Sequence, residues 1–262
     1  MRRVDAHVHA FPDRLALAVR GSLNSSGALT GGVLLPDVAQ LVRDAGFDAA
    51  WILPYAHRAG IAESVNEWSA REVQNFPWLI AGATFHPDDA DLDRLVERAL
   101  VELRLRVVKL HCSVGQFSPA DRRLVPLWRV AADQHVPVIV HAGRQSPGET
   151  SGDEVEELAP VLAANPDLHV VLAHTGFPSI GAALDLMERF DNLYADITPV
   201  WDHPLPVGAA ELRRFPGRFL FGSDAPNSPL SAKAHESRCT QMLLTADEAD
   251  ALMGGTADRL LS

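Results

Sequence analysis

The chain has 262 residues, of which 47% are apolar and 22% are charged, and its 34 acidic and 23 basic residues give a formal net charge of −11. This composition is typical of a globular protein and not of a disordered chain, and no apolar run approaches the ~18 residues of a membrane span. Because an acidic surface repels phosphate backbones, we expect neither a nucleic-acid partner nor a membrane partner.

The two cysteines and the first residues bear on the cellular compartment. Cys112 and Cys239 are far apart and do not form a CxxC motif, which excludes a disulfide framework. The opening segment MRRVDAHVHA lacks the apolar region of a secretory signal. We therefore expect a cytoplasmic protein.

Short apolar runs rich in β-branched residues recur along the whole chain. They lack strict alternation of apolar and polar residues, as expected for strands that are buried on both faces of a parallel sheet. The eight runs are Arg3–Val8, Ala49–Leu53, Leu79–Phe85, Arg106–Leu110, Pro137–His141, His169–His174, Leu193–Ile197 and Arg218–Gly222.

Helical spacing of apolar residues lies between most of these runs. The expected helices are Asp37–Gly46, Asp89–Leu105, Pro119–His135, Gly152–Ala164 and Ile180–Phe190. Strands that alternate with helices pair in parallel through right-handed crossovers. Eight such units predict an α/β fold, a (β/α)8 TIM barrel that forms a single domain over residues 1–262, with an open doubly wound sheet as the alternative.

One segment, Gly21–Gly32, is rich in glycine and serine and follows the first predicted strand. In a barrel it would lie at the end that carries chemistry, where it could form a lid. A long surface loop explains the same composition, and both interpretations stay open.

Polar side chains gather at the ends of the predicted strands. In a barrel these ends meet at one mouth, and residues two apart on a strand share a face, so His7 pairs with His9 and Lys109 with His111. Imidazole and carboxylate groups at one point suit Zn²⁺, Mn²⁺ or Fe²⁺. The candidates at the mouth are His7, His9, Lys109, His111, His141, His174 and Asp224.

The remaining histidines receive different interpretations. His57 and His86 either line the rim of the pocket or lie in loops. His135 and His169 fall near strand starts, the end of a barrel that serves stability, and His235 is expected on a helix surface.

Several segments together resemble one known family. They read VDAHVHA, VVKLHCSVGQF, PVIVHAG, VVLAHTG, NLYADIT, FLFGSDAP and LMGGTADRLL, and their order covers nearly the whole chain. The chain resembles the amidohydrolase-2 branch of the amidohydrolase superfamily, whose members are metal-dependent TIM-barrel hydrolases and decarboxylases.

The resemblance implies roles for the strand-end residues. His7, His9, His141 and Asp224 resemble the metal ligands, and Asp224 also handles the proton of metal-bound water. His174 resembles a catalytic histidine that polarises substrate or water, or that binds a second metal. Lys109 resembles a lysine that either bridges two metals as a carbamate or stays an ammonium that pairs with a substrate carboxylate. We expect one Zn²⁺ and an unmodified lysine, with Mn²⁺ or Fe²⁺ and a second ion as alternatives.

The resemblance also implies the chemistry. Many decarboxylases of this branch are longer, so the compact chain favours a hydrolase that cleaves an amide, lactone or ester bond of a small, anionic metabolite. A decarboxylase acting on a small, aromatic carboxylic acid is the alternative, and a barrel that only binds a metal or metabolite is less consistent with an intact ligand set. We expect Asp196 to support His174 or a neighbouring ligand, and a homo-oligomer is compatible with the sequence. The expected substrate-binding residues are Lys109, His111, Arg144, Arg58 and His203.

Overall fold

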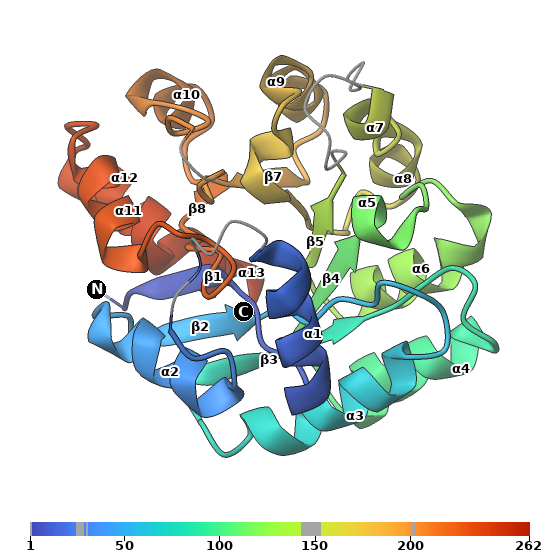
Figure 1. Cartoon of the computed structure of the whole chain (residues 1–262). Helices are drawn as coiled ribbons and strands as arrows, with labels where there is room; N and C mark the ends of the chain where they lie inside the picture. Colours follow the sequence, from blue (N-terminus) through green and yellow to red (C-terminus); the bar gives the residue numbers. More distant parts are fainter. Residues whose placement is uncertain (1, 25–28, 30, 143–152, 201–202) are drawn as a thin grey trace.

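The computed structural model describes residues 2–24, 29, 31–142, 153–200 and 203–262, and it shows an eight-stranded parallel barrel surrounded by helices (Figure 1). The strands are hydrogen-bonded in sequence order, so the predicted TIM barrel is confirmed and the open doubly wound sheet is excluded. They are β1 (Val4–Val8), β2 (Ala49–Ile52), β3 (Leu79–Thr84), β4 (Val107–His111), β5 (Val138–His141), β6 (Val170–Leu172), β7 (Leu193–Asp196) and β8 (Phe219–Leu220).

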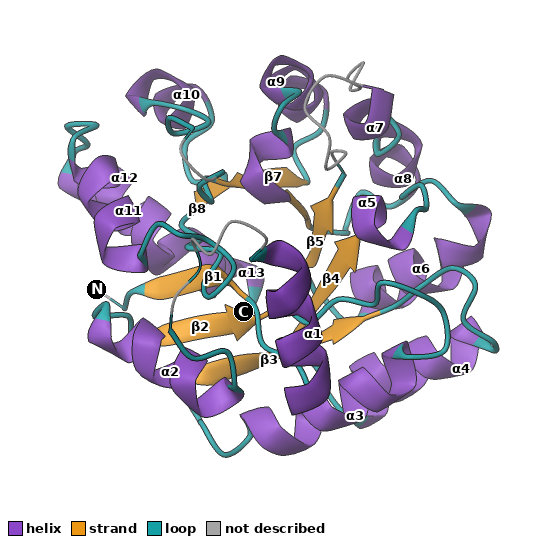
Figure 2. Cartoon of the chain, viewed as in Figure 1, coloured by secondary structure: helices purple, strands orange, loops and turns teal. Residues whose placement is uncertain are grey.

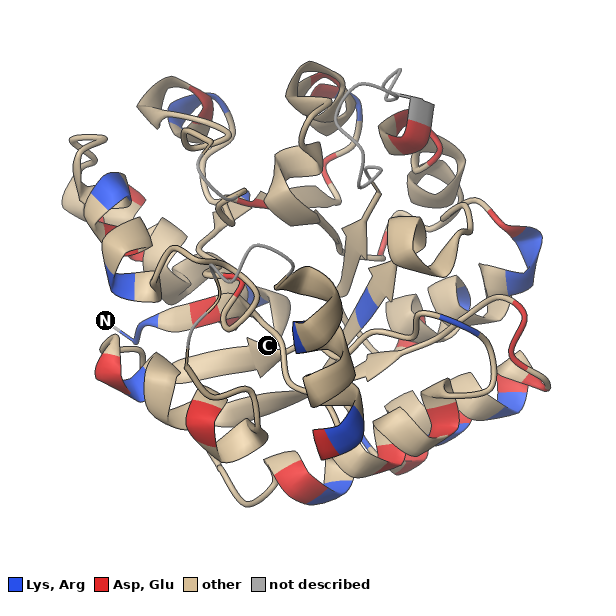
Figure 3. Ribbon diagram, viewed as in Figure 1, with Lys and Arg blue, Asp and Glu red and all other residues tan. Residues whose placement is uncertain are grey.

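Helices pack around the strands of the barrel, most of them on its outer side (Figure 2). They are α1 (Asp13–Leu23), α2 (Leu35–Asp44), α3 (Ala62–Val73), α4 (Leu92–Glu97), α5 (Cys112–Gly115), α6 (Val125–Asp133), α7 (Asp153–Glu156), α8 (Ala159–Ala164), α9 (Ile180–Arg189), α10 (Ala209–Arg214), α11 (Ala232–Thr240), α12 (Ala246–Asp250) and α13 (Thr256–Leu260). None of the described helices is long and apolar enough to cross a membrane. Figure 3 shows that most charged residues lie on helices and loops, whereas the strands carry few.

The structure refines two of the predicted helices and the interpretation of the Gly21–Gly32 segment. The segment predicted as Asp89–Leu105 forms α4 and a π-helical turn at Arg98–Glu102, and the segment predicted as Gly152–Ala164 divides into α7 and α8. The helix α1 ends at Leu23, so the first residues of the Gly21–Gly32 segment are helical. Residues 25–28 and 30 of that segment lie outside the described residues.

Alternate residues of the strands pack into two separate apolar layers. One layer lies between the strands and the helices and contains Val108 and Leu110 of β4. The other contains Trp51, Val107 and Ile139 inside the barrel. Burial on both faces explains why the strands read as continuous apolar runs in the sequence.

The barrel closes between β1 and the residues that follow β8. The Ala6 N–H donates to the Phe221 carbonyl at 2.9 Å, the Asp224 N–H to the His7 carbonyl at 2.9 Å, and the His9 N–H to the Ala225 carbonyl at 2.7 Å. Since β8 itself spans only two residues, this seam depends on the chain beyond it. The seam places Asp224 beside the two histidines of β1.

A β-bulge interrupts the regular pairing of β1 between Asp5 and Val8, around His7. Asp5 is paired with Ala50 of β2 and Val8 with Ile52, so three steps along β1 correspond to two steps along β2. One extra residue of this kind bends a strand and re-aims its side chains. His7 and His9 therefore share a face, as predicted, but their register relative to the start of the strand is shifted by the bulge.

The seam requires a residue without a side chain at position 222. A Cβ on Gly222 would lie 2.2 Å from Thr198 Oγ1 and 2.5 Å from His7 Cβ, much closer than packed atoms approach. Gly222 thus lets the backbone after β8 pass directly against His7.

We expect Gly222→Ala to destabilise the fold by about 1–3 kcal/mol through overpacking, which lowers Tm by several degrees. Gly181→Ala in α9 is the matched control, because no atom lies within 4 Å of the added methyl group. The control should be neutral or stabilising by about 0.5–1 kcal/mol. Equal thermal midpoints of the two variants, measured by circular dichroism, would contradict this account of the seam.

The structure corrects the interpretation of His235. Its side chain is fully buried instead of lying on a helix surface, and its ring lies 4.9 Å from the ring of Phe221. Neither ring nitrogen has a hydrogen-bond partner of good geometry in the described part of the chain. Burial, assisted by the charge of Arg238, lowers the pKa of His235 to about 4. The ring is therefore neutral at neutral pH.

This burial predicts a pH dependence of stability. In the unfolded chain His235 binds a proton below pH ~6.5, whereas in the folded chain it stays neutral until about pH 4. The free energy of unfolding therefore falls as the pH decreases through this range. The loss attributable to His235 is about 2 kcal/mol at pH 5. Urea unfolding at pH 7.5 and pH 5 should show a smaller loss for His235→Leu than for the wild type. His135→Asn, at an exposed position, should keep the wild-type loss.

Candidate metal centre

Three side chains at the mouth of the barrel converge on one point. The Nε2 atoms of His7 and His9 lie 3.1 Å apart, and Oδ1 of Asp224 lies 3.1 Å from His9 Nε2 and 3.9 Å from His7 Nε2. The two histidines come from β1 and the aspartate from the loop after β8, and the hydrogen bonds of the seam hold them together. Only the Asp224 side chain among the three is appreciably exposed, at 16%.

The hydrogen bonds of the two rings determine which nitrogen atoms face this point with a lone pair. Nδ1 of His9 lies 2.7 Å from the Leu53 carbonyl, which can only accept, so Nδ1 carries the proton. Nδ1 of His7 lies 2.8 Å from a carboxylate oxygen of Asp196 and carries a proton for the same reason. The Nε2 atoms of both rings therefore face each other and the Asp224 carboxylate, an arrangement that suits a bound cation.

Asp196 orients two of the candidate residues at once. Its Oδ2 accepts from His7 Nδ1, and its Oδ1 accepts the backbone N–H of His174 at 2.8 Å. Although burial opposes ionisation, His7, His174 and Lys109 hold the pKa of Asp196 well below its usual range. A carboxylate that fixes the tautomer of a ligating histidine is the usual partner in metal sites. The predicted supporting role of Asp196 is consistent with both contacts.

The pKa values of the ligand candidates favour the forms that bind metal. Burial, followed by the charge of Lys109, lowers the pKa of His7 to about 3, so the ring is neutral. For Asp224, burial raises the pKa, but His9, His174 and His7 outweigh it and hold the pKa below its usual value. Neutral imidazole and ionised carboxylate are the forms that coordinate a divalent ion.

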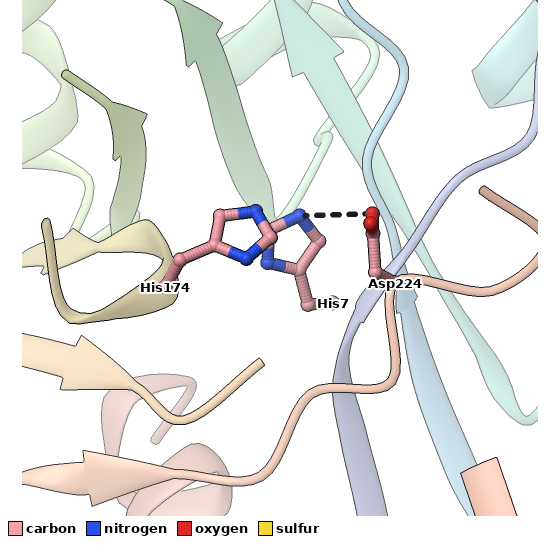
Figure 4. A group of neighbouring side chains, drawn as sticks. All are labelled: His7, His174 and Asp224. Atoms are coloured by element: carbon pink, nitrogen blue, oxygen red, sulfur yellow. Dashed lines mark ion pairs between the residues drawn. The ribbon is translucent and has the colours of Figure 1, made fainter. Parts of the chain in front are cut away.

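His174 lies beside these donors (Figure 4). His7, His174 and Asp224 each have one possible ligand atom in a group whose members lie within 4.8 Å of one another. The backbone of His174 is in the left-handed region, with φ of 52°, and so is that of Asp224, with φ of 59°. Nδ1 of His174 is buried and has no hydrogen-bond partner among the described residues. Both side chains thus reach the site through backbone conformations that L-residues rarely adopt.

Lys109 reaches the same point from β4 and is fully buried. Its Nζ lies 3.1 Å from Nε2 of His7, so an ammonium there donates to the lone pair of the ring. Burial lowers the pKa of Lys109 to about 8, against the opposing effect of Asp196 and Asp224. The lysine is thus a cation or a readily formed neutral amine near physiological pH.

The other two predicted histidines, His111 and His141, stack on each other beside His174. The rings of His111 and His141 lie 4.1 Å apart and nearly parallel, and the ring of His141 lies 4.9 Å from that of His174. Nδ1 of His111 accepts the backbone N–H of Val114, which leaves its Nε2 as the donor. The structure therefore places His141 beside His111 and His174. Among the described residues, the donor atoms that lie within 4.8 Å of one another belong to His7, His174 and Asp224, and His141 is not in that group.

The remaining predicted substrate-binding residues lie elsewhere. Arg58 is exposed in the loop after β2. His203 is exposed too, at a surface crevice of 760 Å³ between α9, α10 and α11. Neither contacts the donor group in the described part of the chain, and Arg144 lies outside the described residues.

Four residues near the site were not predicted from the sequence: Asp5, Phe11, Arg20 and Tyr55. The Tyr55 ring contacts the rings of Phe11, His9 and His111 at 4.8, 5.4 and 4.8 Å. Asp5 is fully buried behind His7. Arg20 of α1 donates to the carbonyl of Pro226, close to Asp224 in the chain, at 3.2 Å. Only Asp5 carried a signal, since a charge inside an apolar strand needs a partner.

Comparisons with known proteins agree with the motifs. The profile of the Amidohydrolase family, amidohydrolase-2, matches residues 4–262. No curated protein matches the sequence significantly. An uncharacterised TIM-barrel protein from Bordetella bronchiseptica is similar in structure, with a TM-score of 0.76, 21% identity, and coverage of 100% of this chain and 98% of that chain.

Two further solved structures that resemble this chain are decarboxylases. A 2,6-dihydroxybenzoate decarboxylase from Rhizobium has a TM-score of 0.74 and 14% identity, over 100% of this chain and 99% of that chain. A 5-carboxyvanillate decarboxylase from Novosphingobium aromaticivorans, with bound manganese, has a TM-score of 0.71 and 14% identity, over 99% and 97%. Identities this low establish the fold alone. Since the family profile spans nearly the whole sequence, the chain belongs to the Amidohydrolase family of TIM-barrel proteins.

Proposed function

We propose that this protein is a metal-dependent decarboxylase that acts on a small aromatic carboxylic acid. The observation that carries the proposal is an aromatic wall directly beside the histidine–aspartate donor set. The ring of Phe11 is parallel to that of His9 at 6.1 Å, and Tyr55 makes edge contacts with Phe11 and His111. Aromatic rings pack favourably against such a wall.

The comparisons support decarboxylation over hydrolysis, the reverse of the ranking that chain length suggests. The 2,6-dihydroxybenzoate and 5-carboxyvanillate decarboxylases act on small aromatic acids, and this chain aligns with 97–99% of their lengths. The compactness that favoured a hydrolase therefore does not separate the two reactions.

The chain's own groups supply the remaining requirements of the reaction. Lys109 and the N–H of His111 Nε2 can bind oxygen atoms of an anionic substrate, because both are donors at the mouth of the barrel. Asp224 can take a proton from water and pass it on, since its side chain is the partly exposed member of the donor group. As the bond to the carboxylate breaks, its electron pair stays on the ring carbon, which receives the proton that Asp224 has taken from water while CO2 leaves.

The donor set fits a divalent ion, by the convergence of lone pairs described above. His7, His9 and Asp224 would hold it, completed by His141, as the sequence predicts, or by His174, which the structure groups with His7 and Asp224. Such an ion would polarise a substrate oxygen and fix the substrate's position. We propose one Zn²⁺ or Mn²⁺, with Lys109 left unmodified.

The reaction is tested with 2,6-dihydroxybenzoate and 5-carboxyvanillate as probes, together with a panel of aryl esters and lactones. We expect CO2 release from an aromatic acid, and in D2O the product should gain one deuterium on carbon. Asp224→Asn should lower the rate by about 10²–10⁴-fold because the proton carrier is lost.

Asp191→Asn, at an exposed carboxylate, serves as the control and should keep full activity. If only esters or lactones react, without CO2 and with ¹⁸O from labelled water in the product, the protein is a hydrolase and the proposal is wrong.

The metal content is predicted separately from the reaction. Elemental mass spectrometry of protein purified without added metal should find about one divalent ion per chain. Catalytic metal sites of this kind leave one coordination position open for water or substrate. His9→Ala should lose the ion and Lys109→Met should retain it, while His203→Ala is a control at an exposed histidine. Two ions per chain, with one lost in Lys109→Met, would show a bridging lysine instead. Comparison of His141→Ala with His174→Ala identifies the remaining ligand.

A further inference from the structure

Asp5 makes an unusual set of contacts at the seam of the barrel. Its side chain is fully buried, and Oδ1 accepts two backbone N–H groups, from His7 at 3.2 Å and from Ser223 at 3.0 Å. His7 is a candidate metal ligand on β1, and Ser223 precedes the candidate ligand Asp224. One carboxylate oxygen therefore joins the two chain segments that supply most of the donor set.

The first contact compensates for the bulge in β1. The extra residue between Asp5 and Val8 removes a backbone group from the regular pairing with β2. A buried N–H without a partner costs about 1–3 kcal/mol, and Asp5 accepts the N–H of His7 instead. The carboxylate thus stabilises the backbone conformation that turns the His7 ring towards the site.

The second contact secures the turn that carries Asp224. Asp5 accepts the N–H of Ser223, and the hydroxyl of Ser223 accepts the N–H of Ala225 at 3.1 Å. The N–H of Asp224 donates to the carbonyl of His7 at 2.9 Å. This network holds Asp224 in its left-handed conformation, which has little local preference of its own.

We propose that Asp5 is a positioning residue of the metal centre, which acts by accepting the two N–H groups that hold His7 and Asp224 in coordinating geometry. The inference rests on the metal site under the proposed function, not on decarboxylation. The proposed role is hydrogen-bond acceptance by Oδ1, the oxygen that both N–H groups reach. Oδ2 has no hydrogen-bond partner among the described residues. An amide at this position could keep Oδ1 as the acceptor and place its NH2 group where Oδ2 now lies.

The test compares Asp5→Ala, Asp5→Asn and a matched control, Asp89→Ala. Asp89 is also a buried carboxylate that accepts two backbone N–H groups, from Gly60 at 2.7 Å and His86 at 2.8 Å, but it lies away from the seam. Zn²⁺ affinity is measured by competition with a chromophoric chelator, and the coordination geometry is followed by the visible absorption spectrum of the Co²⁺-loaded protein.

We expect Asp5→Ala to weaken Zn²⁺ binding about 10–100-fold, as loss of groups that support metal ligands does, and to change the Co²⁺ spectrum. Asp5→Asn should have a Zn²⁺ affinity and a Co²⁺ spectrum close to those of the wild type. Asp89→Ala should lose thermal stability but keep the wild-type Zn²⁺ affinity and Co²⁺ spectrum. The inference is wrong if Asp5→Ala binds Zn²⁺ with the wild-type spectrum. It is equally wrong if Asp5→Asn is as impaired as Asp5→Ala, or if Asp89→Ala weakens binding as much.

Hydrogen exchange of the metal-free protein provides an independent readout. The amides of His7 and Ser223 should exchange faster in Asp5→Ala, while amides of β4 and β5 keep their protection. Faster exchange throughout the barrel would show a general loss of stability and would overturn a positioning role. These measurements do not use turnover, so a protein that binds Zn²⁺ normally but releases no CO2 would refute the proposed reaction and leave this inference intact.

Discussion

The closure of the barrel between β1 and the chain after β8 is the constraint on which the candidate site depends. A parallel barrel needs its last strand to pair with its first, but β8 provides only two residues of regular strand. The backbone from Phe221 to Ala225 completes the pairing with β1, and Gly222 allows that backbone to pass against His7. The same hydrogen bonds that close the barrel therefore bring Asp224, from the far end of the sequence, to the histidines of β1.

Electrostatics then determines what this closure creates. The buried Asp196 and the carbonyl of Leu53 accept hydrogen bonds from the Nδ1–H groups of His7 and His9. The Nε2 atoms of both rings therefore face inward, towards a carboxylate. In a buried environment such a group is unstable without positive charge, since little solvent screens it. Lys109 provides part of that charge at His7, and a divalent ion would supply the remainder. Burial of the histidines, which makes them poor bases, makes them suitable ligands.

The surroundings of the donor set, more than the set itself, bear on the reaction. Hydrolysis and decarboxylation can both use histidine and aspartate at the mouth of a barrel, and a fold hosts many activities through its loops. Here the residues after β1 and β2 provide an aromatic wall of Phe11 and Tyr55, which packs under α1. Arg58 and His203, which were expected to bind substrate, are exposed, whereas the ring of His111 contacts Tyr55 and Lys109 contacts His7. The substrate proposed for this protein follows from that distribution of aromatic rings and hydrogen-bond donors.

The sequence by itself determined the order and number of the strands and the end of the barrel at which the polar residues gather, because burial on both faces and the parallel direction leave a local pattern in each strand. It also indicated the pairing of His7 with His9, since residues two apart share a face. Tertiary structure alone decided the bulge around His7, the left-handed backbone of His174 and Asp224, the burial of His235 and the stacking of His141 on His111. These features depend on contacts between segments as distant as Asp5 and Ser223, 218 positions apart, which no local periodicity records. Strained backbone persists only where such contacts hold it, so its location is a property of the closed barrel.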